Sequence, residues 1–231
     1  MTIAENIARV REQIAEACAR AGRIADSVTL MGVSKTHGVE AIAESYAAGL
    51  RVFGENRVQE FQQKMVGAQF ECASFHLIGP LQSNKTAKAA ELFDAVDTVD
   101  SVKLAQRLNA AAEAVGKVLP VLIEVKLSSE ESKHGMAPGA VSEILHAASS
   151  LPALRLRGLM TVPPYFEDPE EARPYFVQLR ELRDALASVH KDTPLPDLSM
   201  GMSHDFVVAI EEGSTCVRVG TAIFGERSYA E

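Results

Sequence analysis

The sequence of 231 residues contains no tryptophan, little of the other aromatic residues and only three cysteines. Cys18, Cys72 and Cys216 are far apart and lack Cys-x-x-Cys or Cys/His spacing, so we expect neither a disulfide nor a structural zinc site. No run approaches the roughly 18 apolar residues that cross a bilayer. Glu5 and Arg9 also stand where a signal peptide needs an apolar segment. These absences predict a cytoplasmic protein with no membrane partner.

Positive charge is also scarce. Lysine and arginine number 23 against 31 aspartates and glutamates, which gives a formal charge of −8. This balance argues against a nucleic-acid partner and leaves room for a local basic pocket that binds a small anion. The hydrophobic content of 47% is ordinary for a globular protein. Because α/β barrels run to about 200–250 residues as one unit, we expect residues 1–231 to form a single domain.

Helical and strand patterns alternate along the chain. Apolar residues at steps of three and four from Ile3 to Cys18 predict an amphipathic helix over 3–18. Eight short apolar runs predict strands, at 28–34, 51–54, 74–79, 93–99, 118–127, 154–162, 197–201 and 216–220. Helical stretches are predicted between them, at about 38–48, 56–67, 83–91, 101–115, 137–149, 173–190 and 203–212.

Eight strands that alternate with helices favour parallel strand–helix units closed into a single (β/α)8 TIM-type barrel with an extra N-terminal helix. A doubly wound sheet is less consistent with the sequence, because GVSKTHG at 32–38 is not the Gly-x-Gly-x-x-Gly turn of that fold. Pro174 would clash with a preceding helical turn. We therefore predict that the long helix begins near Arg173 and that 168–172 form a separate turn.

Barrel enzymes place their chemistry at the C-terminal ends of the strands. Lys35 directly follows the apolar run LMGVS, and an apolar surrounding favours the neutral amine that attacks a carbonyl, as a Schiff-base lysine must. The alternative is an ordinary surface lysine at a strand end. Lys126, after the fifth strand, is a rival on the same grounds.

The last two strands predict an anion site. Residues 199–203 and 218–225 combine glycines with hydroxyls, and Ser203 is predicted to open a helix, whose N-terminal N–H groups attract anions. Alternatively, Gly201 and Gly220 only turn the chain. Arg218 lies between two valines, and a buried arginine keeps its charge, so it must face an anion or a strong acceptor. That group is either a ligand or the partner of a structural ion pair, Glu124 or Glu55.

The histidines predict no metal site. His76 has apolar neighbours and is interpreted as a core histidine with a hydrogen-bond partner. His37, His134 and His204 lie in expected loops or helix starts without metal-ligand spacing. Paired carboxylates of the glycosidase kind are also missing from the strand ends.

Six strings in order carry a family resemblance that covers nearly the whole chain. They are GVSKT (32–36), FGEN-x-VQE (53–60), FHLIGPLQSNK (75–85), GLMTV (158–162), SMGMS-x-D (199–205) and GST-x-VRVGTAIFGER (213–227). Together they resemble the pyridoxal phosphate homeostasis proteins. The resemblance implies a barrel like the N-terminal domain of alanine racemase, which binds pyridoxal 5'-phosphate without a catalytic partner domain.

The resemblance also implies site residues. Lys35 would hold the cofactor as a Schiff base, Arg218 would face the pyridine nitrogen and Asn56 would lie near the ring. The phosphate would be held by Ser203, Gly220 and Thr221, with help from the backbone of Met202. Two departures from the family pattern, His37-Gly38 after GVSKT and Arg57 in place of tyrosine, touch none of these contacts and leave the role of that loop open.

A cation opposite the pyridine nitrogen disfavours its protonation and weakens the ring as an electron sink. Alanine racemase adds a tyrosine base from a second domain, whereas only six residues follow Gly225 here; Tyr165 is not excluded as a base. We therefore expect no catalytic residues, and a monomer that buffers or delivers pyridoxal 5'-phosphate to apo-enzymes and so affects amino and keto acid metabolism. The alternatives are a weakly active single-domain amino-acid racemase or lyase, and a barrel whose lysine is vestigial.

Overall fold

The structure, a computed structural model, describes residues 1–130 and 134–225. Part of the segment between the predicted strand at 118–127 and the predicted helix at 137–149 lies outside these residues, as does the Glu226-Arg227 end of the last motif. Cys18, Cys72 and Cys216 are free thiols in the structure. Within the described ranges, no helix is long and apolar enough to cross a membrane.

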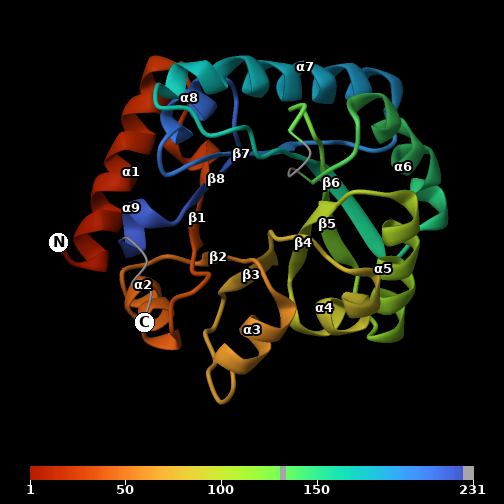
Figure 1. Cartoon of the computed structure of the whole chain (residues 1–231), viewed down its shortest axis with the longest axis horizontal. Helices are drawn as coiled ribbons and strands as arrows, with labels where there is room; N and C mark the ends of the chain where they lie inside the picture. The colour runs from red at the N-terminus through yellow and green to blue at the C-terminus, as the bar shows by residue number, and fades with distance from the viewer. Residues whose placement is uncertain (131–133, 226–231) are drawn as a thin grey trace.

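Eight parallel strands close into a barrel in chain order, which confirms the predicted architecture (Figure 1). The strands are β1 (Thr29–Val33), β2 (Val52–Glu55), β3 (Ser74–Leu77), β4 (Ala95–Val99), β5 (Leu119–Glu124), β6 (Leu154–Met160), β7 (Asp197–Met202) and β8 (Cys216–Val219). All eight predicted strands exist, and their ends differ from the predictions by three residues or fewer. The barrel closes where β1 pairs with β8. The C-terminal ends of all eight strands therefore lie around one opening of the barrel, and the N-terminal ends lie around the other.

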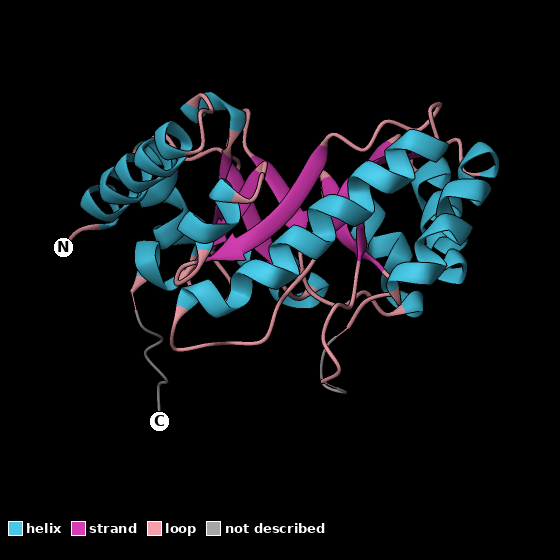
Figure 2. Cartoon of the chain, turned by 90° about the horizontal axis from the view of Figure 1, so that it is seen from above, coloured by secondary structure: helices cyan, strands magenta, loops and turns pink. Residues whose placement is uncertain are grey.

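The helices lie outside the strands, as Figure 2 shows. They are α1 (Ile3–Arg20), α2 (Val39–Ala47), α3 (Val58–Lys64), α4 (Thr86–Leu92), α5 (Val102–Ala114), α6 (Val141–Ala147), α7 (Arg173–Val189), α8 (Phe206–Glu211) and α9 (Thr221–Phe224). The short α9 was not predicted. Several predicted helices are shorter because their first turns are 3-10 helix, as at Ser83–Lys85 and Pro138–Ala140.

The N-terminal helix α1 covers one flank of the barrel. Thr2 accepts a hydrogen bond from the backbone of Glu5, whose side chain returns one to Thr2, and this capping box starts the helix. Ile7, Val10 and Ile14 are buried, and α1 packs against α8 and α9 (Figure 1). The stripe of apolar residues predicted from the sequence therefore faces the elements that follow β7 and β8.

The turn before α7 follows the prediction from Pro174. Asp168 accepts a hydrogen bond from the backbone N–H of Glu170 and starts a 3-10 helix at Pro169–Ala172. Helix α7 then begins at Arg173, which leaves Pro174 in its first turn, where the missing N–H costs no helical hydrogen bond.

Stacked aromatic rings fix α3 against the barrel. Phe61 of α3 lies between Phe93 and Phe75, with ring centroids 4.6 Å and 5.0 Å from its own, and Phe75 stacks on Phe53 at 5.3 Å. Such pairs contribute about 0.5–1.5 kcal/mol each beyond the area they bury. Lys64 lies one turn after Phe61 on the same helix, so the packing of Phe61 also places the Lys64 side chain relative to the barrel.

Candidate functional site at the C-terminal mouth of the barrel

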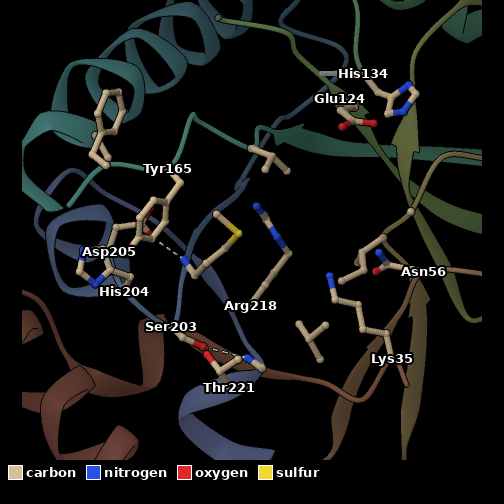
Figure 3. Close-up of a pocket in the computed structure, with 18 of the residues that line it drawn as sticks. Lys35, Asn56, Glu124, His134, Tyr165, Ser203, His204, Asp205, Arg218 and Thr221 are labelled. Carbon is tan, nitrogen blue, oxygen red and sulfur yellow. Dashed lines mark hydrogen bonds between the residues drawn. The ribbon is translucent and has the colours of Figure 1, made fainter. Parts of the chain in front are cut away.

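A cavity of about 540 Å³ opens at the C-terminal ends of the strands. This volume lies within the range of small-molecule sites. The seven residues assigned to a cofactor from the sequence all line this one cavity: Lys35, Asn56, Met202, Ser203, Arg218, Gly220 and Thr221. They come from four strand ends far apart in the sequence, and Figure 3 shows Lys35 and Arg218 directed into the same space.

Lys35 follows β1 in a sharply turned segment. Ser34 is fully buried and its backbone N–H donates to the carbonyl of Gly54, which continues the pairing of β1 with β2. Thr36 has a φ of 67°, a conformation that is strained for a β-branched residue. Lys126 does not line the cavity, and its backbone N–H donates to Met136. The structure therefore separates the two rival lysines and leaves Lys35 as the candidate.

Arg218 lies inside the barrel on β8, while Val217 and Val219 point outward into the core. Its guanidinium donates to the hydroxyl of Ser199 and to the carbonyl of Thr161, both at 2.7 Å. Both acceptors are neutral, and burial lowers the pKa of the guanidinium. Because neutral hydrogen-bond acceptors do not neutralise the charge of a buried cation, Arg218 can still attract an anion in the adjacent cavity.

The ion pair considered for Arg218 is not formed. Within residues 1–130 and 134–225, no carboxylate oxygen lies within 4.0 Å of the Arg218 guanidinium. Glu55 instead pairs with Lys64 at 2.7 Å. Glu124 acts on Arg218 only through longer-range Coulomb attraction.

Ser203 does not open a helix, contrary to the prediction. Helix α8 begins at Phe206, after a turn in which Asp205 accepts a hydrogen bond from the backbone N–H of Met202 at 2.6 Å. The Ser203 hydroxyl instead accepts from the backbone N–H groups of Gly220 and Ala222, at 3.1 Å and 3.3 Å (Figure 3 shows the Gly220 bond). Residues 203–205 therefore form a turn before α8, and the helix has no side-chain hydrogen bond at its N-cap.

The Ser203 contacts bring the predicted anion-binding segments together. The hydroxyl of Ser203 lies at the start of α9, next to Thr221, so N–H donors and two hydroxyl groups border one corner of the cavity. Gly201 and Gly220 differ in backbone conformation. Gly201 has a φ of 94°, and a Cβ there would meet the Cα of Phe206 at 2.9 Å, whereas Gly220 has a negative φ of −106°. The turning role therefore fits Gly201, while Gly220 supplies an N–H group at the cavity.

Two buried carboxyl groups also line the cavity. Burial raises the pKa of Glu124 to about 7, against the opposing effect of Arg218 and with the help of Asp100. No hydrogen bond of the described residues involves the Glu124 carboxylate. Burial likewise raises the pKa of Asp205, although the N–H of Met202 and the charge of Arg218 oppose the shift. Glu124 can therefore change its charge near neutral pH inside the cavity.

Tyr165 and His204 border the cavity on the side of α8. Tyr165, on the segment after β6, is 74% exposed, and its ring lies 5.4 Å from that of His204. His204 contacts the carbonyl of Glu167 through Nε2 at 2.9 Å. The candidate base considered in the sequence analysis is therefore near the site but largely in solvent.

The buried carboxylate of Glu55, next to the turn that holds Lys35, was not predicted from the sequence. Glu55 was considered only as a partner of Arg218, but its carboxylate accepts from Ser34 and from Lys64. The only signal in the sequence is the i,i+4 spacing of Glu60 and Lys64 on a helix that follows FGEN. That spacing suggests a surface pair and does not reveal that Lys64 turns inward.

Comparison with known proteins identifies the family. Residues 4–228 match the model of the alanine racemase N-terminal domain. Over 99% of its length the chain is 46% identical to the pyridoxal phosphate homeostasis protein of Aquifex aeolicus, and 44% identical to that of Escherichia coli K12, covering 100% and 98% of those proteins. The chain belongs to the pyridoxal phosphate homeostasis protein family.

Solved structures agree with this family assignment. PipY of Synechococcus elongatus without PLP has a TM-score of 0.88 and 40% identity, and covers 97% of the chain. PipY with PLP bound has a TM-score of 0.86 and 39% identity. Both alignments span 100% of the PipY chain. An alanine racemase from Clostridium difficile shares the fold at a TM-score of 0.71 and 15% identity, over 57% of its own length.

Proposed function

We propose that this protein binds pyridoxal 5'-phosphate in the C-terminal cavity and acts in its intracellular homeostasis. The observation that carries the proposal is the convergence, in one cavity of about 540 Å³, of an amine, a buried cation and an anion-binding corner. These are the groups that an aldehyde, a pyridine ring and a phosphate require. The name of the related proteins and the PLP-bound PipY structure support the same ligand.

In this proposal the residues of the chain have distinct roles. Lys35 holds the aldehyde as a Schiff base, and Asn56 lies near the ring. Arg218 faces the pyridine nitrogen. The phosphate is held by Ser203, Thr221 and the backbone N–H groups of Met202 and Gly220, of which the first currently donates to Asp205 and the second to Ser203. When bound, the cofactor supplies a reactive carbonyl on an electron-withdrawing ring.

The site favours holding the cofactor over using it in catalysis. Arg218 is a donor and a cation, so it disfavours a proton on the pyridine nitrogen and keeps the ring a weak electron sink. Tyr165, the one tyrosine among residues 1–130 and 134–225 that lines the cavity, is mostly exposed, where its hydroxyl lacks the apolar surrounding that tunes a catalytic base. We therefore propose a monomeric carrier that buffers the cofactor or delivers it to apo-enzymes in the cytoplasm.

To test the proposal, pyridoxal 5'-phosphate is added to the purified protein, the product is reduced with borohydride, and the modified lysine is identified by peptide mapping. We expect a visible absorption band and a reduced adduct on Lys35. Lys35→Ala should abolish both, while Lys126→Ala, the matched lysine outside the cavity, should retain both. A wild-type protein without the band, or with the adduct on Lys126, would refute the proposal.

A second candidate function, a weak amino-acid racemase or lyase, is favoured by the position of Tyr165 at the cavity. Incubation with L-alanine or L-serine, followed by chiral and product analysis, decides between the two. Turnover above about one per second, within the usual enzymatic range, that is lost in Tyr165→Phe would replace the carrier function by the enzymatic one.

A further inference from the structure

A buried ion pair lies directly behind the turn that presents Lys35. The Glu55 carboxylate, at the end of β2, accepts hydrogen bonds from the Ser34 hydroxyl and from the Lys64 ammonium, both at 2.7 Å and both on Oε1. The Lys64 ammonium also donates to the carbonyl of Ser34 at 2.9 Å. Glu55 is fully buried, and the side chain of Lys64 is only 7% exposed. Ser34 is thus held through its side chain and its carbonyl by one charged pair.

The same helix holds the other side of the turn. Glu60, one helical turn before Lys64 on α3, accepts a hydrogen bond from the backbone N–H of Thr36 at 2.8 Å. The strained φ of 67° at Thr36 is thereby fixed by a specific acceptor. The residues before and after Lys35 are therefore both anchored to α3, whose position is set by the stacked ring of Phe61.

Stability alone does not explain this arrangement. Removing two opposite charges from water costs about as much as their attraction returns, so an apolar pair of similar volume would stabilise the fold at least as well. The second carboxylate oxygen of Glu55 is buried and has no hydrogen-bond partner in the described part of the chain, which adds to the cost. What an apolar pair could not supply is directional bonding to the hydroxyl and carbonyl of Ser34.

We propose that Glu55 and Lys64 are positioning residues for Lys35: together they hold the Ser34–Thr36 turn so that the Lys35 amine meets an aldehyde in the cavity at a fixed place. This inference rests on the proposed function, in which Lys35 forms the covalent bond. It assigns to the two residues no contact with the ligand. They act through the backbone of Ser34, and Glu60 supports them at Thr36.

The test separates covalent attachment from non-covalent binding. Lys64→Met removes the ammonium and keeps most of the apolar stem. We expect the rate of Schiff-base formation with pyridoxal 5'-phosphate to fall about tenfold or more, since small misplacements of reacting groups have effects of this size. The affinity for pyridoxine 5'-phosphate, which lacks the aldehyde, should change by no more than about threefold, because the anion-binding corner and Arg218 are untouched.

Lys88→Met is the matched control. Lys88 forms an ion pair with Glu91 at 3.0 Å on the surface of α4, so the substitution removes the same charge from an exposed pair. We expect it to change neither measurement. If Lys64→Met fails to fold because Glu55 is left unpaired, the double variant Glu55→Gln/Lys64→Met removes both charges and retains an oxygen acceptor for Ser34, and the same fall in rate is expected there.

The outcomes are distinct. An unchanged attachment rate in a folded Lys64 variant overturns the positioning role while leaving the proposed function in place. A parallel loss of attachment rate and pyridoxine 5'-phosphate affinity also overturns it, since it shows that the pair supports the whole site. If the wild-type protein forms no adduct on Lys35, the proposed function fails first and this inference with it.

Discussion

The two ends of the barrel both open onto cavities, yet their polar groups are arranged differently. The C-terminal cavity holds Lys35 and Arg218, and the carboxylate of Glu124 makes no hydrogen bond with the described residues. The N-terminal cavity, of about 330 Å³, is lined by three aspartates and one arginine that pair with neighbouring protein groups.

The pairing at the N-terminal end is specific. His76 contacts Asp97 through Nδ1 at 3.3 Å and Ser74 through Nε2 at 3.1 Å, while Arg157 donates to Asp197 at 2.8 Å. His76 thus has hydrogen-bond partners, as predicted, but its side chain is 23% exposed at the N-terminal cavity and its partners are polar, so it is not the core histidine that was expected. The charged side chains at the N-terminal end therefore pair with side chains of neighbouring strands, whereas at the C-terminal end Arg218 donates to the neutral acceptors Ser199 and Thr161. Barrel proteins place their ligands at the C-terminal ends of the strands.

The largest effect expected from this comparison is on folding. In Gly158→Ala, at the N-terminal end, the new Cβ would lie 1.9 Å from the carbonyl oxygen of Asp197, so β6 and β7 must separate. We expect a loss of about 3 kcal/mol or more in the free energy of unfolding, measured by urea denaturation. Gly139→Ala, where a Cβ meets nothing within 4 Å, is the control. Equal stability of the two variants would contradict the packing argument.

The next effect compares one arginine from each end. Arg218→Met removes the buried cation of the C-terminal cavity, and we expect the affinity for pyridoxine 5'-phosphate to fall about 100-fold, or about 2.7 kcal/mol. Arg157→Met, at the other end, should leave the affinity unchanged and reduce stability by less than about 1 kcal/mol, since its ion pair is partly exposed. Calorimetric titration and denaturation measure the two quantities. A similar loss of affinity in both variants would refute the division of roles.

A smaller effect concerns Asp97 and is pH-dependent. Burial lowers the pKa of His76, but the charge and hydrogen bond of Asp97, with help from Asp94 and Asp197, outweigh burial and raise it. The histidine therefore stabilises the fold below its unfolded pKa of about 6.5, and this contribution is lost as the pH rises through the higher folded pKa.

We expect Asp97→Asn to cost about 1–2 kcal/mol at pH 5.5 and less at pH 9, measured by denaturation at each pH. The affinity for pyridoxine 5'-phosphate should change little. A cost that grows with pH would show that His76 is not the titrating partner.

The smallest effect is expected from Glu124→Gln. Because burial raises the pKa of Glu124 to about 7, the wild-type cavity gains a negative charge between pH 6 and pH 8 and repels an anionic ligand. The glutamine variant should therefore bind pyridoxine 5'-phosphate about as well as wild type at pH 6 and about three- to fivefold better at pH 8. The affinities of both proteins are measured at each pH, and their ratio is compared, because ionisation of the ligand affects both proteins equally and does not change the ratio. A constant ratio would contradict the raised pKa.

Much of the fold could be predicted from sequence because its signals are local. The 3.6-residue spacing from Ile7 to Ile14 predicts the buried face of α1, and Pro174 predicts the start of α7. The eight apolar runs predict eight strands. The helix predicted to open at Ser203 begins at Phe206 instead, because residues 203–205 form a turn in which Asp205 accepts from Met202 and Ser203 accepts from Gly220. The spacing of apolar residues does not reveal such a turn.

The sequence by itself determined the barrel, the family and the positions of Lys35 and Arg218 at strand ends, since periodicity and motifs are properties of neighbouring residues. Only the tertiary structure decided the partners. It gave Arg218 the neutral acceptors Ser199 and Thr161 and turned Lys64 inward to Glu55. The physical reason is that closing the barrel brings side chains from distant strands within hydrogen-bonding distance, where burial makes each unpaired charge costly and therefore selects its partner.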